Sequence, residues 1–228
     1  MSATLPVITE QTLDRARLAA LAREGSAQAL IGCDLEEADL SGLDLASWSF
    51  ERCRLRRANL KGAMLEGTAW TGCRGAFADF RSADLGEATF SGCDFNNANF
   101  DGARLVEARI AGCKLTGASF VEAKTLDARF EETLLADAKL PGFSFRKAAL
   151  KRVDFAQADL CKCDFRETVF EACSLRDAHL TDARFEGADL RGADLGGIRL
   201  VDAKRFKGAT ISRQQAGEIL AELGLKVR

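Results

Sequence analysis

Large apolar residues recur at every fifth position over most of this chain. In residues 91–120, SGCDFNNANFDGARLVEARIAGCKLTGASF, each fifth residue is Phe, Leu or Ile, and the residue two positions earlier is Ala or Cys. The same register holds at every multiple of five from Leu30 to Leu200, where only Gly75 and Thr125 are not Leu, Phe, Ile or Trp. A period of five fits neither an α-helix nor a flat β-strand. The chain is therefore an array of short repeats.

The two apolar columns suggest how the repeats pack. We write i for the large residue of each repeat, so that the small residue stands at i−2. A chain that turns by about a right angle every five residues forms a four-sided coil of twenty residues, with the large side chains in the middle and the small ones beside them. One coil cannot close its own core, so the coils must stack as a solenoid. Gly at i+2 in many repeats favours a turn with positive φ.

The repeated segments ANFDGARL and ADLRGADL resemble the pentapeptide-repeat family, whose pattern is A(D/N)LXX. The resemblance covers residues 28–200. It implies an all-β fold, a right-handed quadrilateral β-helix with short N- and C-terminal capping helices. We expect three segments: an N-terminal cap over residues 1–27, the solenoid over residues 28–211, and a C-terminal helix and tail over residues 212–228.

Both ends carry helix signals. Thr9 or Thr12 is a suitable N-cap for a helix that ends near Glu24, before Gly25. Its expected apolar stripe consists of Leu13, Ala16, Ala20 and Leu21. We expect this helix to cover the open first coil, and the alternative is a partner-binding helix.

At the other end, the register breaks after Leu200 and resumes one residue late, so that Ala209, Thr210 and Ile211 form a last repeat. Ser212 then caps a helix that is expected to run through Leu223, with Gly224 as its stop. The helix and tail leave more apolar surface than a cap requires, which predicts a homodimer. The expected dimerisation residues are Ala216, Ile219, Leu220, Leu223, Leu225 and Val227.

Two positions interrupt the columns inside the array. Gly75 leaves a gap where a large side chain is expected. Thr125 followed by Leu126 suggests a one-residue slip that is recovered by Phe130. Because the multiple-of-five numbering survives both, neither position carries an inserted loop.

The cysteines and the single histidine do not suggest catalysis. Seven of the eight Cys stand at i−2, where they are expected to be reduced, buried apolar residues and not metal ligands. Cys161, at i+1, is the expected exposed and reactive thiol, and His179 is expected to be a solvated surface residue. No nucleophile–His–acid set or phosphate-binding loop is apparent. We therefore expect a non-enzymatic protein with no catalytic residue, metal, cofactor or small-molecule substrate.

The chain has no run of eighteen apolar residues and no basic segment followed by an apolar one at its start. No membrane span or signal peptide is expected, and a cytoplasmic location is the default.

Charge is unevenly distributed, although the net charge is only −2. The outward positions of two adjoining faces of the predicted coil, those with i at 40, 60, 80 and at 45, 65, 85, carry most of the negative charge. We call ten acids of these faces the acidic edge: Asp39, Asp44, Asp79, Asp84, Glu87, Asp101, Glu107, Asp159, Asp164 and Glu167. B-DNA is also a rod of regular negative charge, so such an edge suggests DNA mimicry. The alternative is that Asp at i−1 only supports the turns.

The tail KGATISRQQAGEILAELGLKVR resembles the ending of the Qnr/MfpA-type quinolone-resistance proteins. The matching residues are Gly208, Ile211, Gln215, Leu220, Leu223, Gly224, Leu225 and Val227. That resemblance implies a symmetric dimer that binds DNA gyrase or topoisomerase IV and protects it from quinolones, with no direct nucleic-acid binding. The chain departs from Qnr proteins in having no inserted loop between coils. The other hypothesis is a pentapeptide-repeat scaffold or adaptor for a different protein partner.

Overall fold

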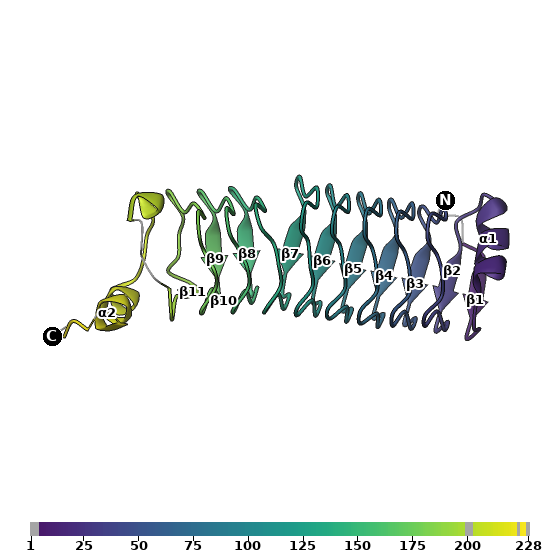
Figure 1. Ribbon diagram of the computed structural model, residues 1–228, viewed down its shortest axis with the longest axis horizontal. Coiled ribbons are helices and arrows are strands. Elements are labelled where there is room, and N and C mark those ends of the chain that lie inside the picture. The colour runs from purple at the N-terminus through teal and green to yellow at the C-terminus, as the bar shows by residue number, and fades with distance from the viewer. Residues whose placement is uncertain (1–4, 199–202, 223, 227–228) are drawn as a thin grey trace. The chain divides into compact units, whose positions relative to one another are not determined.

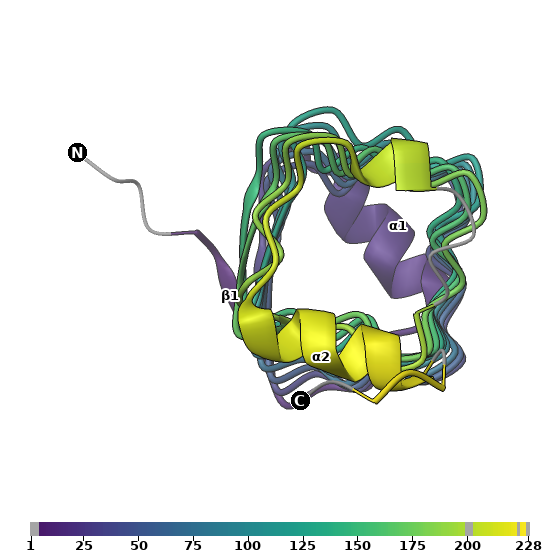
Figure 2. The same cartoon turned by 90° about the vertical axis from the view of Figure 1, so that its left-hand side faces the viewer.

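The computed structural model describes residues 5–198, 203–222 and 224–226. It contains two compact units, residues 1–129 and residues 130–228. Within each unit the chain winds into stacked four-sided coils (Figure 2). The predicted fold class, a quadrilateral β-helix with a short helix near each end, is confirmed.

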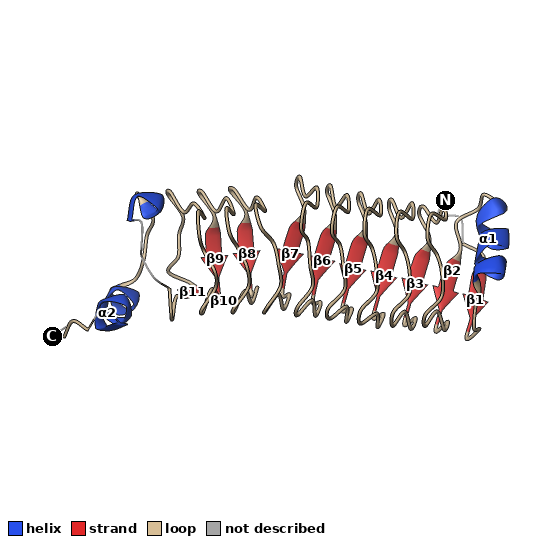
Figure 3. Cartoon of the chain, viewed as in Figure 1, coloured by secondary structure: helices blue, strands red, loops and turns tan. Residues whose placement is uncertain are grey.

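The first unit contains one parallel sheet, in which each strand pairs with the equivalent strand of the next coil. Its strands are β1 (Val7–Thr9), β2 (Ala29–Ile31), β3 (Ser49–Glu51), β4 (Ala69–Thr71), β5 (Thr89–Ser91) and β6 (Arg109–Ala111). They follow one another along the unit in chain order (Figure 1). The other sides of the coils are turns and isolated bridges, so that most of the chain is drawn as loop (Figure 3).

Burial follows the two sequence columns. Phe100 at i and Ala103 at i−2 are both buried, whereas the residues at i+2 face solvent. The i+2 residues have positive φ whether they are Gly, as at Gly62, or not, as at Glu87. Each coil therefore turns at i+2, and the large side chains of successive coils stack inside it. Phe100 lies parallel to Phe80 and Phe120, with ring centroids 4.8 and 4.9 Å away.

The N-terminal helix differs from the prediction in its cap and its buried face. Helix α1 (Arg15–Arg23) is capped by Asp14, whose Oδ1 accepts a hydrogen bond from the Arg17 amide. Thr9 and Thr12 do not cap it, because they pair with Ile31 and Asp34 and belong to the first coil.

The buried face of α1 consists of Leu18 and Leu21, and Leu13 just before the helix is buried too. Ala16 and Ala20 are exposed, so the predicted stripe is wrong at these two positions. α1 lies across the opening of the coils of its own unit (Figure 2).

The two irregular positions of the first unit keep the register. The gap at Gly75 is filled from the next coil by the ring of Phe95. The predicted slip at Thr125 is wrong: the Ala128 amide donates to the Thr125 carbonyl as at other turns, and Leu126 occupies i+1 with 70% exposure.

The second unit contains β7 (Arg129–Glu131), which begins at the last residue of the first unit, β8 (Ala149–Lys151) and β9 (Val169–Glu171). The short strands β10 (Cys173–Ser174) and β11 (Ala193–Asp194) form a further parallel pair. The 3-10 helix η1 (Ala203–Phe206) and helix α2 (Arg213–Glu222) follow. Thr210 pairs with Asp189 and Phe206 stacks on Phe185, both twenty-one residues apart, which confirms the one-residue shift.

The predicted cap of α2 is also confirmed. The Gln215 amide donates to Ser212 Oγ, while Gln215 Oε1 accepts from the Ser212 amide, a capping box. Gly224, with φ of +81°, donates to the Ala221 carbonyl at the end of the helix. No helix among the described residues has the length and apolarity needed to cross a membrane.

Candidate protein-interaction surface

The Asp residues of the acidic edge are built into the turns of the coil. Six of the ten acids stand at i−1, and the carboxylate of each accepts a hydrogen bond of 3.0–3.2 Å from the backbone N–H two residues later. These six are Asp39, Asp44, Asp79, Asp84, Asp159 and Asp164. Asn59 and Asn99 make the same bond at the same position. Asp at i−1 therefore has a structural role that an amide oxygen can also fill.

Several of these carboxylates also hold an arginine. Asp79 binds the guanidinium of Arg81 through both oxygens, with a shortest N–O distance of 2.5 Å. Asp164 binds Arg166 in the same way in the second unit, with a shortest distance of 2.5 Å. The arginine hydrogen bonds lower the pKa of both carboxyl groups. Part of the predicted negative charge is therefore neutralised on the surface itself.

Three further members of the acidic edge have cationic partners. Asp84 lies 2.8 Å from Arg104, and Asp39 lies 3.0 Å from Arg15 of α1. In the second unit, Glu167 lies 3.3 Å from Arg146 and 3.8 Å from Lys147. The other five acids form no ion pair with any residue that the structure describes: Asp44, Glu87, Asp101, Glu107 and Asp159.

The unpaired acids of the first unit include a column that sequence reasoning recognised only in part. Glu87 and Glu107 occupy i+2 in successive coils, and Asp127 occupies i+2 in the coil after them. All three are exposed and have φ between 57° and 60°. This corner column, Glu87, Glu107 and Asp127, lies in the turn that leads to the β5–β6 side, not at the Asp79 side. Grouping the acids by i+2 position would have found Asp127.

The predicted dimerisation residues of α2 and the tail differ in exposure. Ile219 is buried, Ala216 is half-buried, and Leu220 and Leu225 are 38% and 56% exposed. Leu223 and Val227 lie outside the residues whose side chains are described. An apolar pocket of about 180 Å³ lies beside Ile219 at the end of the last coil. Its other lining residues are Leu175, Phe185, Leu190, Leu195, Ile198, Phe206, Ala209 and Ile211.

Gln215 fixes α2 against these coils. It is buried, and its Nε2 donates to the carbonyl oxygens of Leu190 and Ala193 at 2.7 Å each. Elsewhere in the array the carbonyl at i−2 accepts an N–H from the next coil, as Cys33 does from Arg54. At Ala193 the side-chain amide of Gln215 takes the place of that donor. A polar contact therefore attaches α2 to the coils, while the apolar pocket beside Ile219 remains unfilled.

The cysteines are as expected at i−2. All eight are free, and the seven at i−2 are buried. Burial raises the pKa of Cys163 to about 12, which keeps that thiol protonated. Cys161 is the partly exposed one. Burial and the neighbouring Asp159 carboxylate raise its pKa.

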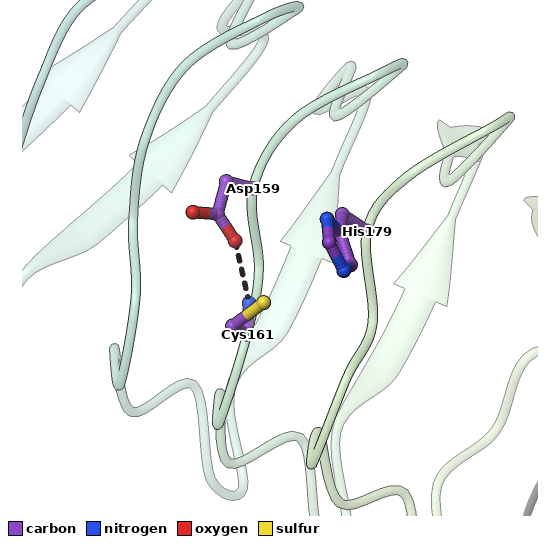
Figure 4. A group of neighbouring side chains, drawn as sticks. All are labelled: Asp159, Cys161 and His179. Carbon is purple, nitrogen blue, oxygen red and sulfur yellow. Dashed lines mark hydrogen bonds between the residues drawn. The ribbon is translucent and has the colours of Figure 1, made fainter.

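The structure also brings together three residues that were considered separately in the sequence. Asp159, Cys161 and His179 each offer one ligand atom, and these atoms lie within 4.8 Å of one another (Figure 4). The signal was available, because residues twenty apart stack and Cys161 and His179 are eighteen apart on one side of the coil.

Family models match much of this sequence. The pentapeptide repeat region model matches residues 83–160, and the model of eight pentapeptide repeats matches residues 33–69, 53–92 and 168–204. The chain belongs to the pentapeptide-repeat family. No curated protein matches it significantly.

Among solved structures, two trypsin-treated variants of QnrB1, described as a plasmid-mediated fluoroquinolone resistance protein, have similar folds. They are 23% and 24% identical to this chain, with TM-scores of 0.66 and 0.60. Each match covers 89% of this chain and 98% of the other. At these identities the similarity establishes the shared fold.

Proposed function

We propose that this protein is a non-enzymatic DNA mimic that binds a type II topoisomerase, DNA gyrase or topoisomerase IV, and modulates it or protects it from quinolones. The fold shared with a fluoroquinolone resistance protein supports this target. Exposed acids at regular coil spacing support the mode of binding, because a DNA-handling enzyme presents a basic groove to such a surface.

The observation that carries the proposal is the corner column. Its three acids occupy the same turn position in three successive coils. Neighbouring acids are therefore about 4.8 Å apart along the column, if the coils have β spacing. B-DNA carries about one charge per 3.4 Å along each strand. The column therefore resembles one strand of phosphates in direction and sign, at a somewhat lower charge density.

The decisive experiment is a gyrase supercoiling assay, with and without a quinolone, over a range of protein concentration. The test variant combines Glu87→Gln, Glu107→Gln and Asp127→Asn. Gln157 and Asn97 already occupy i+2 with positive φ, so these replacements suit the turn. We expect the parent protein to alter supercoiling or restore it in the presence of the drug, and the variant to require at least about tenfold more protein.

A matched control removes three charges from elsewhere in the same unit. Glu10, Glu36 and Glu37 are exposed, and the turn at Glu36 and Glu37 lies diagonally across the coil from the corner column. The triple Gln variant at these positions should act like the parent. Equal loss in both variants would mean that net charge, and not the column, governs binding.

A scaffold or adaptor for another protein is the second candidate. It is favoured by the arginine pairs at Asp79, Asp84 and Asp164, which reduce the mimicry charge. If gyrase and topoisomerase IV activities stay unchanged at a large excess of the parent protein, with and without drug, the scaffold function replaces the topoisomerase proposal.

For assembly, we propose a homodimer through α2 and the tail. Leu220 and Leu225 are exposed, and an apolar pocket lies beside Ile219 of the same helix. An isologous contact at this end would remove these side chains from water.

A further inference from the structure

The stacking register places three different metal-ligating side chains on one outward side of two adjacent coils. Asp159 pairs with His179 in a parallel bridge, and the Leu160 amide donates to the His179 carbonyl at 2.9 Å. Cys161 follows Asp159 by two residues. One ligand atom from each residue lies within 4.8 Å of the other two (Figure 4).

The donor set is selective. It combines a thiol sulfur, an imidazole nitrogen and a carboxylate oxygen, whereas Mg²⁺ and Ca²⁺ require six or more oxygen ligands. Zn²⁺ accepts all three donors, at about 2.3 Å for sulfur and about 2.0–2.2 Å for nitrogen and oxygen. We propose that Asp159, Cys161 and His179 bind one Zn²⁺ ion, with water at the fourth position.

The required movement is small. In a tetrahedral zinc site, ligand atoms lie about 3.5 Å apart, so atoms already within 4.8 Å need to approach by about 1 Å. All three residues are partly or fully accessible to solvent, and side-chain rotation can supply this approach. The ion would also relieve the repulsion between the Asp159 carboxylate and the Cys161 thiolate, which loses its proton when the metal binds.

Neighbouring groups already orient two of the ligands. Asp159 Oδ1 accepts the Cys161 amide at 3.1 Å, which holds the carboxylate over the turn. His179 Nε2 lies 3.0 Å from Thr181 Oγ1. When Nε2 carries the hydrogen and donates it to Thr181, the Nδ1 lone pair is left for the metal, an arrangement typical of histidine ligands.

This proposal does not depend on topoisomerase binding, and it is tested by metal binding itself. Full-length, tag-free protein is titrated with ZnCl₂ against a chromophoric chelator, and Co²⁺ is used as a spectroscopic probe of thiolate ligation. The variants are Cys161→Ser and His179→Asn. Ser41 and Asn59 occupy the same two positions on the same side of the coil, so both replacements suit the fold. Thermal unfolding verifies that each variant is folded.

Asp154→Asn is the matched control. Asp154 accepts the Ala156 amide at 2.9 Å, the same turn bond that Asp159 makes, but it is not part of the cluster. We expect one Zn²⁺ per chain in the parent and in this control, and protection of Cys161 from alkylation by iodoacetamide.

Each ligand variant should lose at least about tenfold in zinc affinity, and Cys161→Ser should abolish the thiolate-to-cobalt absorption band. Failure of the parent to bind zinc in competition with the chelator would overturn the proposal. Zinc affinity that is unchanged in both ligand variants would do so as well.

Discussion

The ring of Phe95 occupies the space in which a side chain at Gly75 would lie. Phe95 is buried and makes edge contacts with Trp70 and Phe80, at centroid distances of 6.1 and 5.4 Å. The missing large residue of one coil is therefore supplied by the next coil. The core stays filled although the column is interrupted.

This relationship predicts that restoring the repeat consensus at Gly75 is harmful. Gly75→Leu should lower the free energy of unfolding by about 1–3 kcal/mol, because the core is already full and Phe95 has to move. Urea unfolding followed by circular dichroism measures the loss. Gly62→Asn is the control, since a Cβ there meets no atom within 4 Å and Asn tolerates its positive φ. A stable Gly75→Leu variant would show that this core is loosely packed.

Substitutions in the two buried columns should both destabilise the fold, although one removes side-chain volume and the other adds it. Phe100→Ala removes the middle ring of a three-ring stack and should cost about 3–5 kcal/mol. Ala103→Leu inserts a large group at a fully buried i−2 position and should cost about 1–3 kcal/mol. Chemical unfolding of both variants tests the assignment of the two positions, and near-neutral values for both would refute it.

The sequence was sufficient for features that depend on the five-residue period. The one-residue shift of the last repeat was predicted, and the pairing of Thr210 with Asp189 and the stacking of Phe206 on Phe185 confirm it. The N-terminal cap was not predictable in this way. Thr9 and Thr12 have the right chemistry for an N-cap, but their backbones pair with the next coil, a long-range contact that outweighs local propensity.

The sequence predicts which acidic side chains lie on the surface, but the prediction missed the arginines that neutralise several of them. The i−1 and i+1 side chains share one side of the coil, so the segments Asp79-Phe80-Arg81 and Asp164-Phe165-Arg166 could have been read as local ion pairs. The pair between Asp84 and Arg104 joins successive coils and requires the stacking register. Predicting that Asp159, Cys161 and His179 lie close together requires the same stacking register.

Asp79 should make stability depend on pH in the acid range. Its pKa is lowered by the Arg81 hydrogen bonds, so its folded-state pKa lies below the unfolded value. The stabilisation is therefore present above the unfolded pKa and lost as pH falls through the folded pKa, below about pH 4. Asp79→Asn should lose no more than about 1 kcal/mol at pH 7, since its partner Arg81 is half-exposed to solvent.

Urea midpoints between pH 7 and pH 2 measure this dependence. The Asp79→Asn variant should lose less stability on acidification than the parent. Asp44→Asn serves as a control, because Asp44 makes the turn bond without an ion pair to any described residue. Parallel pH curves for parent and Asp79→Asn would mean that the Arg81 pair contributes no net stability.

The dimer proposal is tested by charging the exposed apolar residues of the C-terminal end. Leu220→Lys with Leu225→Lys should convert a dimer to a monomer in light scattering, because two ammonium groups on each protomer would oppose an apolar contact. Gln214→Lys with Glu218→Gln changes the charge of α2 equally at exposed polar positions and should leave the mass unchanged. If light scattering gives the parent protein the mass of one chain, the dimer proposal is wrong.

The final prediction separates the structural and the electrostatic roles of the turn aspartates. The test replaces four members of the acidic edge together: Asp79, Asp84, Asp159 and Asp164. Changing all four to Asn keeps an oxygen that can accept the backbone N–H, as Asn59 and Asn99 already do. The free energy of unfolding should change little, while changing them to Ala should cost about 0.5–1.5 kcal/mol at each turn.

If the acidic edge contributes to topoisomerase binding, the Asn variant should show weaker inhibition or protection of gyrase than the parent, with the largest difference at low salt. Because the corner column keeps its charge in this variant, its activity should remain above that of the corner-column triple variant. Gyrase activity equal to that of the parent would assign these four aspartates to the turns alone and leave the corner column as the interaction surface.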